Sequence, residues 1–368
     1  MNICFFSEYF NQGGIGRVTS IIMNSLAERK EHKIYSLTYA KASIESIYYV
    51  SEIIKCDYLL EQRVSMKEAI LRRGIISRLD QYLMTNHIDI LIACGDLLFP
   101  ISVLMKKRDR QVICWDHTSP HVNKDQQFQR ISRLMGIYLS SKNVLLTEKA
   151  LSVFNDYPLI NKKKNYQIYN PIDPAIKCNN DYRIDSTKII SIGRLCYQKN
   201  FDRLLNVAAK VFCNSAFNNW TWDIYGIGPD WDALIKKRKA LGLDNRVFFK
   251  GQVADLYNRY NDYSFIVMTS RYEGFPMALL EASANGLPMI SFDIMTGPNE
   301  IINDDNGYLC NDKDDSEIVE AITRMIESPV ERLRMSEGSQ KSLERFSINS
   351  IINQWNDLFS IISGELLQ

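Results

Sequence analysis

Short apolar segments alternate with longer segments of helical periodicity along the chain, and this alternation most constrains its fold. The short segments are rich in β-branched and aromatic residues, as buried parallel strands are, and crossover-length segments follow them. The pattern predicts an α/β fold with parallel sheets. We expect strands at Ile3–Phe6, Lys33–Leu37, Ile88–Ala93, Val112–Trp115, Val144–Thr147 and Gln167–Tyr169, and a second series at Ile189–Ile192, Thr221–Tyr225, Val247–Phe249, Phe265–Met268 and Met289–Phe292.

The length of 368 residues predicts two domains, because one ordinary hydrophobic core rarely organises so long a chain. A polar stretch from Asn170 to Ser186 contains two prolines and separates the two series of strands, so we place the boundary there. The segment from Ser347 to Ile362 carries apolar residues at helical spacing. It predicts a final helix that packs against a large surface.

Composition narrows the classes of function. A formal net charge of +1 gives the molecule no general attraction to nucleic acid, so we expect no nucleic-acid partner. The eight cysteines are scattered without a CxxC pair, and we interpret them as buried thiols of a reducing compartment. No basic leader is evident, and no apolar run reaches the roughly 18 residues needed to span a bilayer. We therefore expect a cytoplasmic protein.

The strongest local feature is residues 271–276, Arg-Tyr-Glu-Gly-Phe-Pro, between a predicted strand and a predicted helix. A glycine-containing turn before a helix exposes backbone N–H groups, which suit phosphate or a developing anionic oxygen. Pro276 is expected at the first helical position. Glu273 and Glu281, eight residues apart, can contact one ligand at different depths, and carboxylates accept hydrogen bonds from sugar and ribose hydroxyls. The alternative is an ordinary loop glutamate and a solvated helix residue.

A second constellation follows the first strand of the second series. Arg194 and Lys199 lie after the strand, at the sheet edge where ligands of open parallel sheets bind. Two cations at this place can neutralise a diphosphate leaving group without a metal ion. The alternative reading is a pair of solvated surface charges.

The shared order of several short motifs resembles the family 4 retaining glycosyltransferases of the GT-B fold, the glycosyl transferases of group 1. The resemblance extends over almost the whole length. It rests on Gly13–Arg17, Tyr169–Asp173, Ile192–Arg194 with Lys199, Tyr225–Pro229, Arg246 and Val247 with Gly251 and Val253, the block from Glu273 to Glu281, Gly297–Ile302 and Asn306–Leu309.

This resemblance implies two Rossmann-like parallel-sheet domains that face each other across a cleft. Residues 1–172 would bind the acceptor and residues 173–346 the nucleotide sugar, while the helix in 347–368 would cross back onto the first domain. It further implies transfer of a hexose or N-acetylhexosamine from a nucleotide sugar, with UDP the expected nucleotide. The acceptor would be a saccharide, such as a polyprenyl-diphosphate-linked one, in capsule, O-antigen or related cell-surface polysaccharide synthesis. Neither a cofactor nor a metal is expected.

The resemblance also assigns roles to individual residues. Arg194 and Lys199 would bind the donor diphosphate, Glu281 the ribose, and Glu273 with the amides around Gly274 and Phe275 the transferred sugar. Gly14, which lacks a side chain, would let the first domain's backbone approach the donor phosphates. His117 matches the position whose imidazole contacts the donor sugar. His121 lies four residues later and is the alternative, and Asp116 would either orient an imidazole or cap the next turn.

Basic residues of the first domain form a candidate membrane-binding surface. Between Arg63 and Leu83, basic and apolar residues mix as in an amphipathic helix pair, and a second basic cluster lies at Lys106, Lys107, Arg108 and Arg110. Such surfaces bind anionic lipid at the inner face of the plasma membrane. The alternative is solvated charge on helices packed into the domain.

Other sequence features and folds compete with the transferase assignment. Gly226 and Gly228 follow a strand as in dinucleotide-binding folds, but Trp231 occupies the position of the third glycine, which disfavours a dehydrogenase. Asp312 and Asp314 resemble a metal-binding acidic pair, yet a helix cap explains them in a polar turn. A sugar-nucleotide epimerase, a phosphorylase-like enzyme or a non-catalytic donor-binding subunit remain as alternatives of the same fold.

Overall fold

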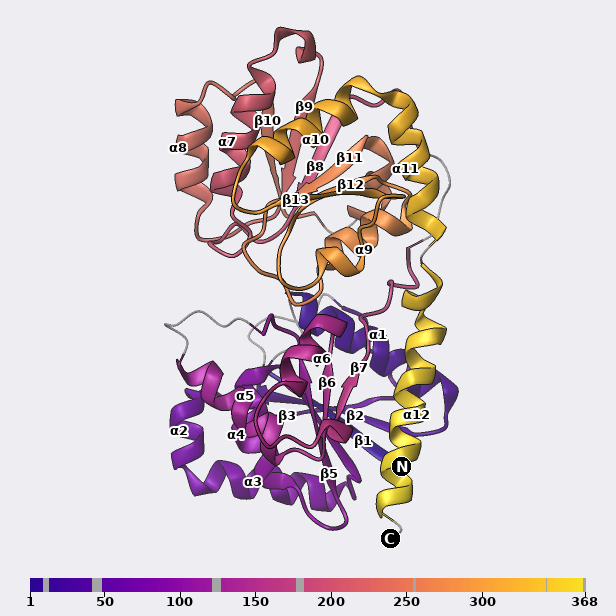
Figure 1. Ribbon diagram of the computed structural model, residues 1–368. Coiled ribbons are helices and arrows are strands. Elements are labelled where there is room, and N and C mark those ends of the chain that lie inside the picture. Colours follow the sequence, from indigo (N-terminus) through magenta and orange to yellow (C-terminus); the bar gives the residue numbers. More distant parts are fainter. Residues whose placement is uncertain are drawn as a thin grey trace. The chain divides into compact units, whose positions relative to one another are not determined.

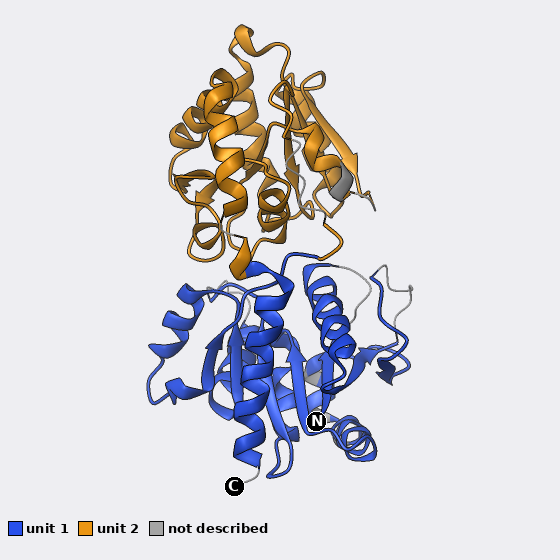
Figure 2. Cartoon of the chain, turned by 90° about the vertical axis from the view of Figure 1, so that its right-hand side faces the viewer, with its two compact units in different colours: residues 1–173, 346–368 blue, residues 174–345 orange. Residues whose placement is uncertain are grey.

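The computed structural model describes residues 1–8, 13–41, 48–120, 127–176, 182–253, 256–341 and 343–366. The chain forms two compact units (Figure 2). The first consists of residues 1–173 and 346–368, and the second of residues 174–345. These limits lie one residue from the divisions placed by sequence at 172/173 and 346/347. The acceptor and donor roles of the two domains remain predictions.

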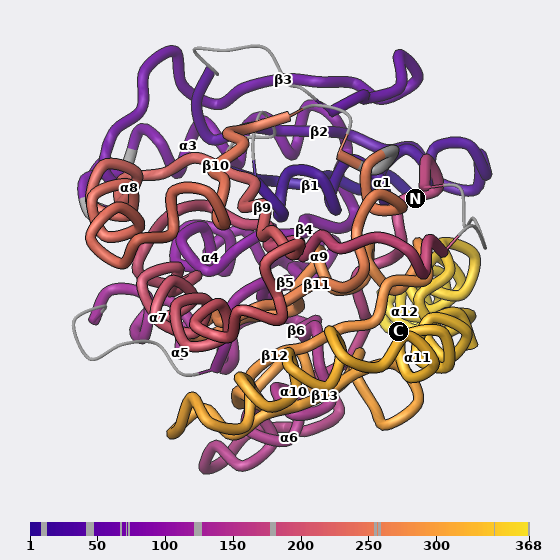
Figure 3. The backbone as a smooth tube through the Cα atoms, turned by 90° about the horizontal axis from the view of Figure 1, so that it is seen from above, coloured from indigo at the N-terminus to yellow at the C-terminus, as the bar shows by residue number. Residues whose placement is uncertain are grey.

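The first unit contains a sheet of seven parallel strands in the order β3-β2-β1-β4-β5-β6-β7. Figure 3, which is seen from above, labels β3, β2, β1, β4, β5 and β6 in this order. Helices connect the strands. The elements are β1 (Asn2–Ser7), α1 (Gly13–Arg29), β2 (Lys33–Ala40), β3 (Lys55–Leu60), α2 (Met66–Leu71), α3 (Arg73–Thr85), β4 (Ile90–Cys94), α4 (Phe99–Ser102), β5 (Gln111–Asp116), α5 (Gln127–Leu139), β6 (Lys142–Leu145), α6 (Glu148–Asn155) and β7 (Asn165–Gln167).

The second unit repeats the arrangement with six parallel strands in the order β10-β9-β8-β11-β12-β13. Helices α7 and α10 pack together, and α9 packs against α11. The elements are β8 (Lys188–Ile192), α7 (Phe201–Phe212), β9 (Thr221–Tyr225), α8 (Trp231–Ala240), β10 (Val247–Gly251), β11 (Phe265–Met268), α9 (Met277–Ala284), β12 (Met289–Asp293), β13 (Gly307–Asn311), α10 (Ser316–Glu327) and α11 (Pro329–Lys341).

Both sheets have the strand order of Rossmann-like folds, so the expected fold class of two such parallel-sheet domains is confirmed. Each order reverses once, between β1 and β4 in the first sheet and between β8 and β11 in the second. Ligands of such sheets bind outside the carboxyl ends of the strands at this reversal. The loops after β8 and β11 therefore define where a site in the second unit is expected.

The last helix, α12 (Ile348–Leu366), returns to the first unit (Figure 1). It packs beside α1, and its Trp355 is fully buried. The Trp355 ring lies 5.1 Å from that of Trp115 and 6.4 Å from that of Phe5. Ile172 N donates a 2.9 Å hydrogen bond to Phe346 O. This bond joins the segment that leaves the first unit to the segment that returns to it. The apolar stripe of α12 thus completes the first unit's core.

Several sequence-based expectations differ from the structure. The edge strands β3 and β13 were not predicted, and the expected strands Val144–Thr147 and Gln167–Tyr169 lie two residues earlier. Thr147 instead caps α6, because its hydroxyl accepts a hydrogen bond from Ala150 N. The expectation of uniformly buried cysteines is wrong for Cys56 and Cys213, which are exposed, and Cys178 lies outside the described residues.

Candidate active site

The loop after β8 begins the candidate site in the second unit. Backbone hydrogen bonds of 3.0 Å join Gly193 N to Tyr225 O and Leu195 N to Ile227 O. A Cβ on Gly226 would lie 1.9 Å from Gly193 O, and one on Gly228 would lie 2.2 Å from Leu195 O. These glycines therefore let the loops after β8 and β9 lie against each other. This packing accounts for both glycines without a dinucleotide.

The side chain of Lys199 crosses back over Gly193 and reaches Glu273. A Cβ on Gly193 would lie 3.1 Å from the Lys199 stem, so the glycine leaves room for it. Lys199 Nζ lies 2.6 Å from Glu273 Oε1. Gln198 Nε2 donates to Tyr272 O at 3.1 Å and to Glu273 Oε2 at 3.4 Å. Two neighbouring residues after β8 thus hold both oxygens of a buried carboxylate after β11.

The turn that carries Glu273 is also held from the other side. Thr296 Oγ1 donates to Glu273 O at 2.5 Å. Gly297, with φ of 103°, packs so tightly that a Cβ would lie 2.6 Å from Pro276 Cδ. Pro276 is the N-cap residue of α9, not its first helical residue as expected from sequence. Its carbonyl accepts hydrogen bonds from Leu279 and Leu280, which begins the helix one residue later.

Backbone donors cluster where α9 begins. The N–H groups of Gly274, Met277 and Ala278 have no hydrogen-bond partner among the described residues. Phe275, which lies between Gly274 and Met277 in the sequence, is buried. Unpaired amides at a helix N-terminus, together with the helix dipole, favour a negatively charged group. The start of α9 is suited to phosphate or to a developing oxyanion.

Glu281 and Arg194 stand in contrasting surroundings. Glu281 is buried on α9, where Tyr260 donates its hydroxyl to Oε2 at 2.7 Å. Arg194, in the loop after β8, is exposed and has no hydrogen-bond or ion-pair partner among the described residues. Glu281 is therefore a positioned acceptor, whereas Arg194 is an exposed cation without a partner among the described residues.

The remaining predicted residues lie in the first unit. Gly14 is exposed in the first turn of α1, with open space where a side chain would begin. His117 follows β5, is buried, and lies 4.2 Å from Trp115 between ring centroids. Its Nε2 has no hydrogen-bond partner among the residues that the structure describes. Burial lowers the pKa of His117 to about 3, so the imidazole is neutral at physiological pH. His121 lies outside the described residues.

Asp116 does not bond the neighbouring imidazole. Its Oδ1 accepts hydrogen bonds of 2.9 Å from the backbone N and the hydroxyl of Thr118, and its Oδ2 lies 2.7 Å from Arg133 Nε. It therefore caps the turn after β5, which was the second of the two expected roles. Burial, reinforced by the Asp116 charge, raises the pKa of the adjacent Asp96 to about 6. Arg133 stands between the two carboxylates and balances their charge.

The second unit is similar in sequence to a known protein family over most of its length. Residues 177–342 match the family model "Glycosyl transferases group 1".

Relatives along the whole chain agree with this glycosyl transferase match. An uncharacterized glycosyltransferase of Haemophilus influenzae is 24% identical over 96% of this chain and 98% of its own length. The amylovoran biosynthesis glycosyltransferase AmsD of Erwinia amylovora is 26% identical over 95% of this chain and 97% of its own. The chain is thus homologous to glycosyltransferases, among them enzymes of bacterial polysaccharide synthesis.

The solved structure of Anabaena HepE in complex with UDP has the same fold, with a TM-score of 0.78 at 17% identity. The match covers 98% of this chain and 100% of that one. The two parallel-sheet units are those of GT-B glycosyl transferases.

Three contacts of the candidate site have no signal in the sequence. Gln198 stood inside a predicted motif without a role, since only tertiary structure brings its amide to Glu273. Tyr260 lies in a short 3₁₀ helix (Leu256–Asp262) with no motif around it. Arg133 reaches the loop after β5 from α5, 17 residues away in sequence. No local pattern marks any of these three.

Apolar residues of the basic segments pack into the first unit, whereas most of the basic side chains whose burial the structure describes are exposed. Ile75, Leu79 and Leu83 of α3 are buried in the core of that unit. Arg110 is buried and forms an ion pair with Asp80, to which Lys107 also binds at 2.8 Å. Arg110 is therefore not part of a surface cluster, which corrects the expectation, and membrane contact remains a prediction. No helix among the described residues is long and apolar enough to cross a bilayer.

Of the acidic pair Asp312 and Asp314 after β13, Asp314 has a structural role. Asp314 accepts a hydrogen bond from Ser316 N at 3.1 Å, in the turn that leads into α10. Within the described ranges, no three His, Cys, Asp or Glu side chains are grouped so that they can hold a metal ion. Metal independence is untested and remains a prediction.

Proposed function

We propose that this protein is a retaining glycosyltransferase that moves a hexose or N-acetylhexosamine from UDP to a saccharide acceptor, in bacterial cell-surface polysaccharide synthesis. The observation that carries the proposal is the Lys199–Glu273 pair at 2.6 Å, next to the unpaired amides at the start of α9. It lies at the strand-order reversal of the second sheet. The family match and the AmsD relative support the reaction class, and the UDP bound to HepE supports the nucleotide.

In this proposal the second unit binds the donor. Arg194, Lys199 and the amide of Gly274 contact the diphosphate, where negative charge develops as the sugar departs. Lys199 shares its charge with Glu273, so Arg194 supplies the larger uncompensated attraction. Glu273 and the amides around Phe275 orient the transferred sugar. Glu281 accepts hydrogen bonds from the ribose.

The reaction breaks the bond between the anomeric carbon and the diphosphate oxygen. The acceptor hydroxyl oxygen forms the new bond on the same face of the sugar, which preserves the anomeric configuration. The hydroxyl proton passes to the departing diphosphate, so atoms and charge balance without a protein base. We propose that Arg194, Lys199 and the α9 amides stabilise the diphosphate without a divalent metal.

The first unit contributes the acceptor domain and two donor contacts in this proposal. The neutral His117 imidazole contacts the donor sugar through Nε2, which has no partner within the described segments of the chain. Gly14 lets the backbone at the start of α1 approach the donor phosphates. We propose a polyprenyl-diphosphate-linked saccharide as acceptor, extended at the cytoplasmic face of the membrane.

Turnover of UDP-sugars tests this function. The wild-type protein is incubated with UDP-glucose, UDP-galactose and UDP-N-acetylglucosamine, with and without lipid-linked saccharide acceptors, and UDP release is measured. Glu273→Ala and Lys199→Ala are expected to abolish turnover while circular dichroism shows a folded chain. Arg238→Ala on α8 removes a 2.8 Å ion pair with Asp244, is the matched control and retains turnover. Full activity of both site variants would refute the assignment.

Product analysis separates the transferase from an epimerase. A transferase yields free UDP and a glycosylated acceptor or, slowly, free sugar. An epimerase converts UDP-N-acetylglucosamine alone into a new sugar nucleotide. Appearance of that nucleotide would replace the proposed reaction with the alternative one.

A further inference from the structure

Helix α5 of the first unit exposes apolar side chains along one face. It packs against α4 and the 3₁₀ helix Val103–Met105. The face that these contacts leave open carries Ile131, Leu134 and Tyr138, which are all exposed and repeat at helical spacing. Ile131 is 59% exposed. An apolar stripe on a helix normally packs into a core, so this one is available to an external partner.

Two neighbouring segments continue the stripe. The Tyr138 hydroxyl donates to Pro158 O at 2.8 Å, and the next residue, Leu159, is fully exposed with φ of 60°. Leu104, in the 3₁₀ helix that α5 contacts, is also exposed. We use the name α5 surface for the exposed apolar residues Leu104, Ile131, Leu134, Tyr138, Leu139 and Leu159.

Lysine-rich segments border the α5 surface, at residues 106–108 and 162–164. Their acidic neighbours are Asp109 and Asp156, so positive charge is in excess. The side chains that are exposed and have no hydrogen-bond or ion-pair partner among the described residues are those of Lys106, Arg108, Lys162 and Lys163. An unpaired cluster of cations attracts a negatively charged partner.

The two lysine-rich segments lie near each other and near the end of α5. Lys164 Nζ donates to the carbonyls of Tyr138 and Ser140, at 3.4 Å and 3.0 Å. Burial, together with the charges of Lys106 and Lys142, lowers the pKa of Lys164. Because a neighbouring charge shifts a pKa mainly at short range, Lys106 lies close to Lys164. The apolar and the basic residues thus share one region of the first unit.

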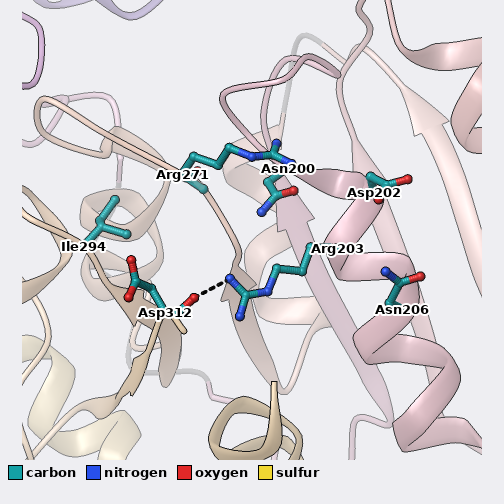
Figure 4. Close-up of a pocket in the computed structure, with 8 residues that line it drawn as sticks. Asn200, Asp202, Arg203, Asn206, Arg271, Ile294 and Asp312 are labelled. Atoms are coloured by element: carbon teal, nitrogen blue, oxygen red, sulfur yellow. Dashed lines mark hydrogen bonds between the residues drawn. The ribbon is translucent and has the colours of Figure 1, made fainter. Parts of the chain in front are cut away.

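The recess at the start of α7 in the second unit shows the contrast between paired and unpaired charges. There Arg203 donates to the Asp312 carbonyl at 2.7 Å (Figure 4) and to Asp315 Oδ1 at 2.7 Å. Asp202 lies 2.7 Å from Lys237 Nζ. The charges of that recess are compensated within the chain, whereas the unpaired lysines beside the α5 surface are available to a partner.

The combination of exposed apolar side chains and unpaired cations selects the class of partner. A soluble anion would account for the cations but not for the apolar residues, and an apolar ligand would leave the cations unused. An anionic lipid bilayer satisfies both, because apolar side chains enter the boundary between headgroups and acyl chains while lysines contact the headgroups.

We propose that the α5 surface binds an anionic lipid bilayer. This surface differs from the one expected from sequence, which included Lys106 and Arg108 but neither α5 nor residues 162–164. On its inner side, α5 carries Arg133, which lies 2.7 Å from Asp116 in the loop of His117. Binding through α5 therefore brings this loop of the acceptor domain close to lipid. That consequence rests on the proposed function, whereas lipid binding itself does not.

Vesicle flotation of the full chain tests the proposal, with phosphatidylcholine vesicles and with vesicles that also contain about 30% phosphatidylglycerol. Ile131→Ser/Leu159→Asn removes two exposed apolar side chains, and asparagine tolerates the positive φ at position 159. Lys162→Glu/Lys163→Glu reverses two unpaired charges. Neither variant removes a buried side chain, so both are expected to fold.

Matched controls carry the same kinds of change on the second unit. Val330→Ser removes an exposed apolar side chain at the start of α11, and Lys236→Glu/Lys239→Glu reverses two exposed charges on α8. UDP affinity and thermal unfolding are measured on every variant.

We expect the wild type to bind the anionic vesicles at least about tenfold more tightly than the neutral ones, and both α5-surface variants to lose at least about tenfold in that affinity. The controls should retain it, and UDP affinity should stay unchanged throughout. No binding to anionic vesicles, equal binding to both kinds, or equal losses in the controls would overturn the proposal. A loss confined to the charge-reversal variant would indicate a site for a soluble polyanion and would overturn it too. Failure of UDP-sugar turnover with intact vesicle binding would contradict the proposed function alone.

Discussion

The two proposed diphosphate cations differ in their surroundings, and this difference has measurable consequences. Lys199 is engaged with the buried Glu273, while Arg194 is exposed and unpaired among the described residues. Removing Lys199 leaves a buried carboxylate without its ion-pair partner, which costs stability. Removing Arg194 leaves no described residue without a hydrogen-bond or ion-pair partner that it had before.

We predict that Arg194→Ala weakens UDP binding about 10- to 100-fold, as loss of a charge-assisted hydrogen bond does, without changing the free energy of unfolding. Lys199→Ala should weaken UDP binding similarly and also lower the free energy of unfolding by about 1–3 kcal/mol. Calorimetric titration and chemical denaturation measure the two quantities. Equal destabilisation by both variants would contradict the ion-pair account.

The burial of His117 as a neutral imidazole predicts that the free energy of unfolding depends on pH. The folded protein keeps the imidazole neutral down to a pKa of about 3, whereas the unfolded chain takes up the proton near pH 6.5. The contribution of the neutral His117 imidazole to the free energy of unfolding is therefore fully present above pH 6.5 and is lost as the pH falls toward 3. Asp96, whose pKa is raised to about 6, acts in the opposite direction over part of this range.

We expect His117→Leu to remove this component, so that the difference between wild type and variant in free energy of unfolding shrinks by about 2–4 kcal/mol between pH 7 and pH 4. Because Asp96 is present in both proteins, its contribution largely cancels. Denaturation at several pH values measures the difference. A constant difference across this range would show that His117 is not buried as a neutral base.

At the scale of elements, the contact between the loops after β8 and β9 depends on glycine. Gly228→Ala would place a Cβ 2.2 Å from Leu195 O, so the loops must separate. We predict a loss of about 2–4 kcal/mol in the free energy of unfolding. UDP affinity should also fall, because the β8 loop carries Arg194. Gly364→Ala in α12 meets open space and serves as the control, with no measurable loss.

Sequence periodicity predicted the central strands and missed two of the four edge strands, β3 and β13. The central strands β1, β4, β8 and β11 are buried on both faces, so their apolar runs are unmistakable. The edge strand β3 begins with exposed Lys55 and Cys56, and β13 begins with a glycine. Backbone pairing to a single neighbour forms these strands without a long apolar run. Their existence follows from the sheet rather than from local sequence.

The candidate site was partly predictable for a related reason. Lys199 and Glu273 each lie in motifs directly after a strand, and parallel strands bring their carboxyl ends to one edge. Their mutual ion pair, and the role of Gln198, depend on side-chain paths that no spacing specifies. The exposed Arg194 and the buried Glu281 were assigned similar importance from sequence, although the structure gives them different environments.

At the scale of the whole molecule, two units with separate cores predict separate unfolding transitions. Trp355 of α12 belongs to the core of the first unit, where it contacts Phe5 and Trp115. We predict that Trp355→Ala destabilises that unit by about 3–5 kcal/mol. Differential scanning calorimetry should show one unfolding transition at a lower temperature and the other at an unchanged temperature. Equal lowering of both would mean that the units unfold as one.

The central claim is that arginine, lysine and backbone amides of the second unit hold the diphosphate of a UDP-sugar without a divalent metal. Calorimetric titration of UDP in the presence of EDTA, into the wild-type protein and into the Arg194→Ala/Lys199→Ala double variant, tests it most directly. The account predicts saturable binding by the wild type and at least about 100-fold weaker binding by the double variant. Equal affinities, or wild-type binding that appears only when Mg²⁺ is restored, would contradict it.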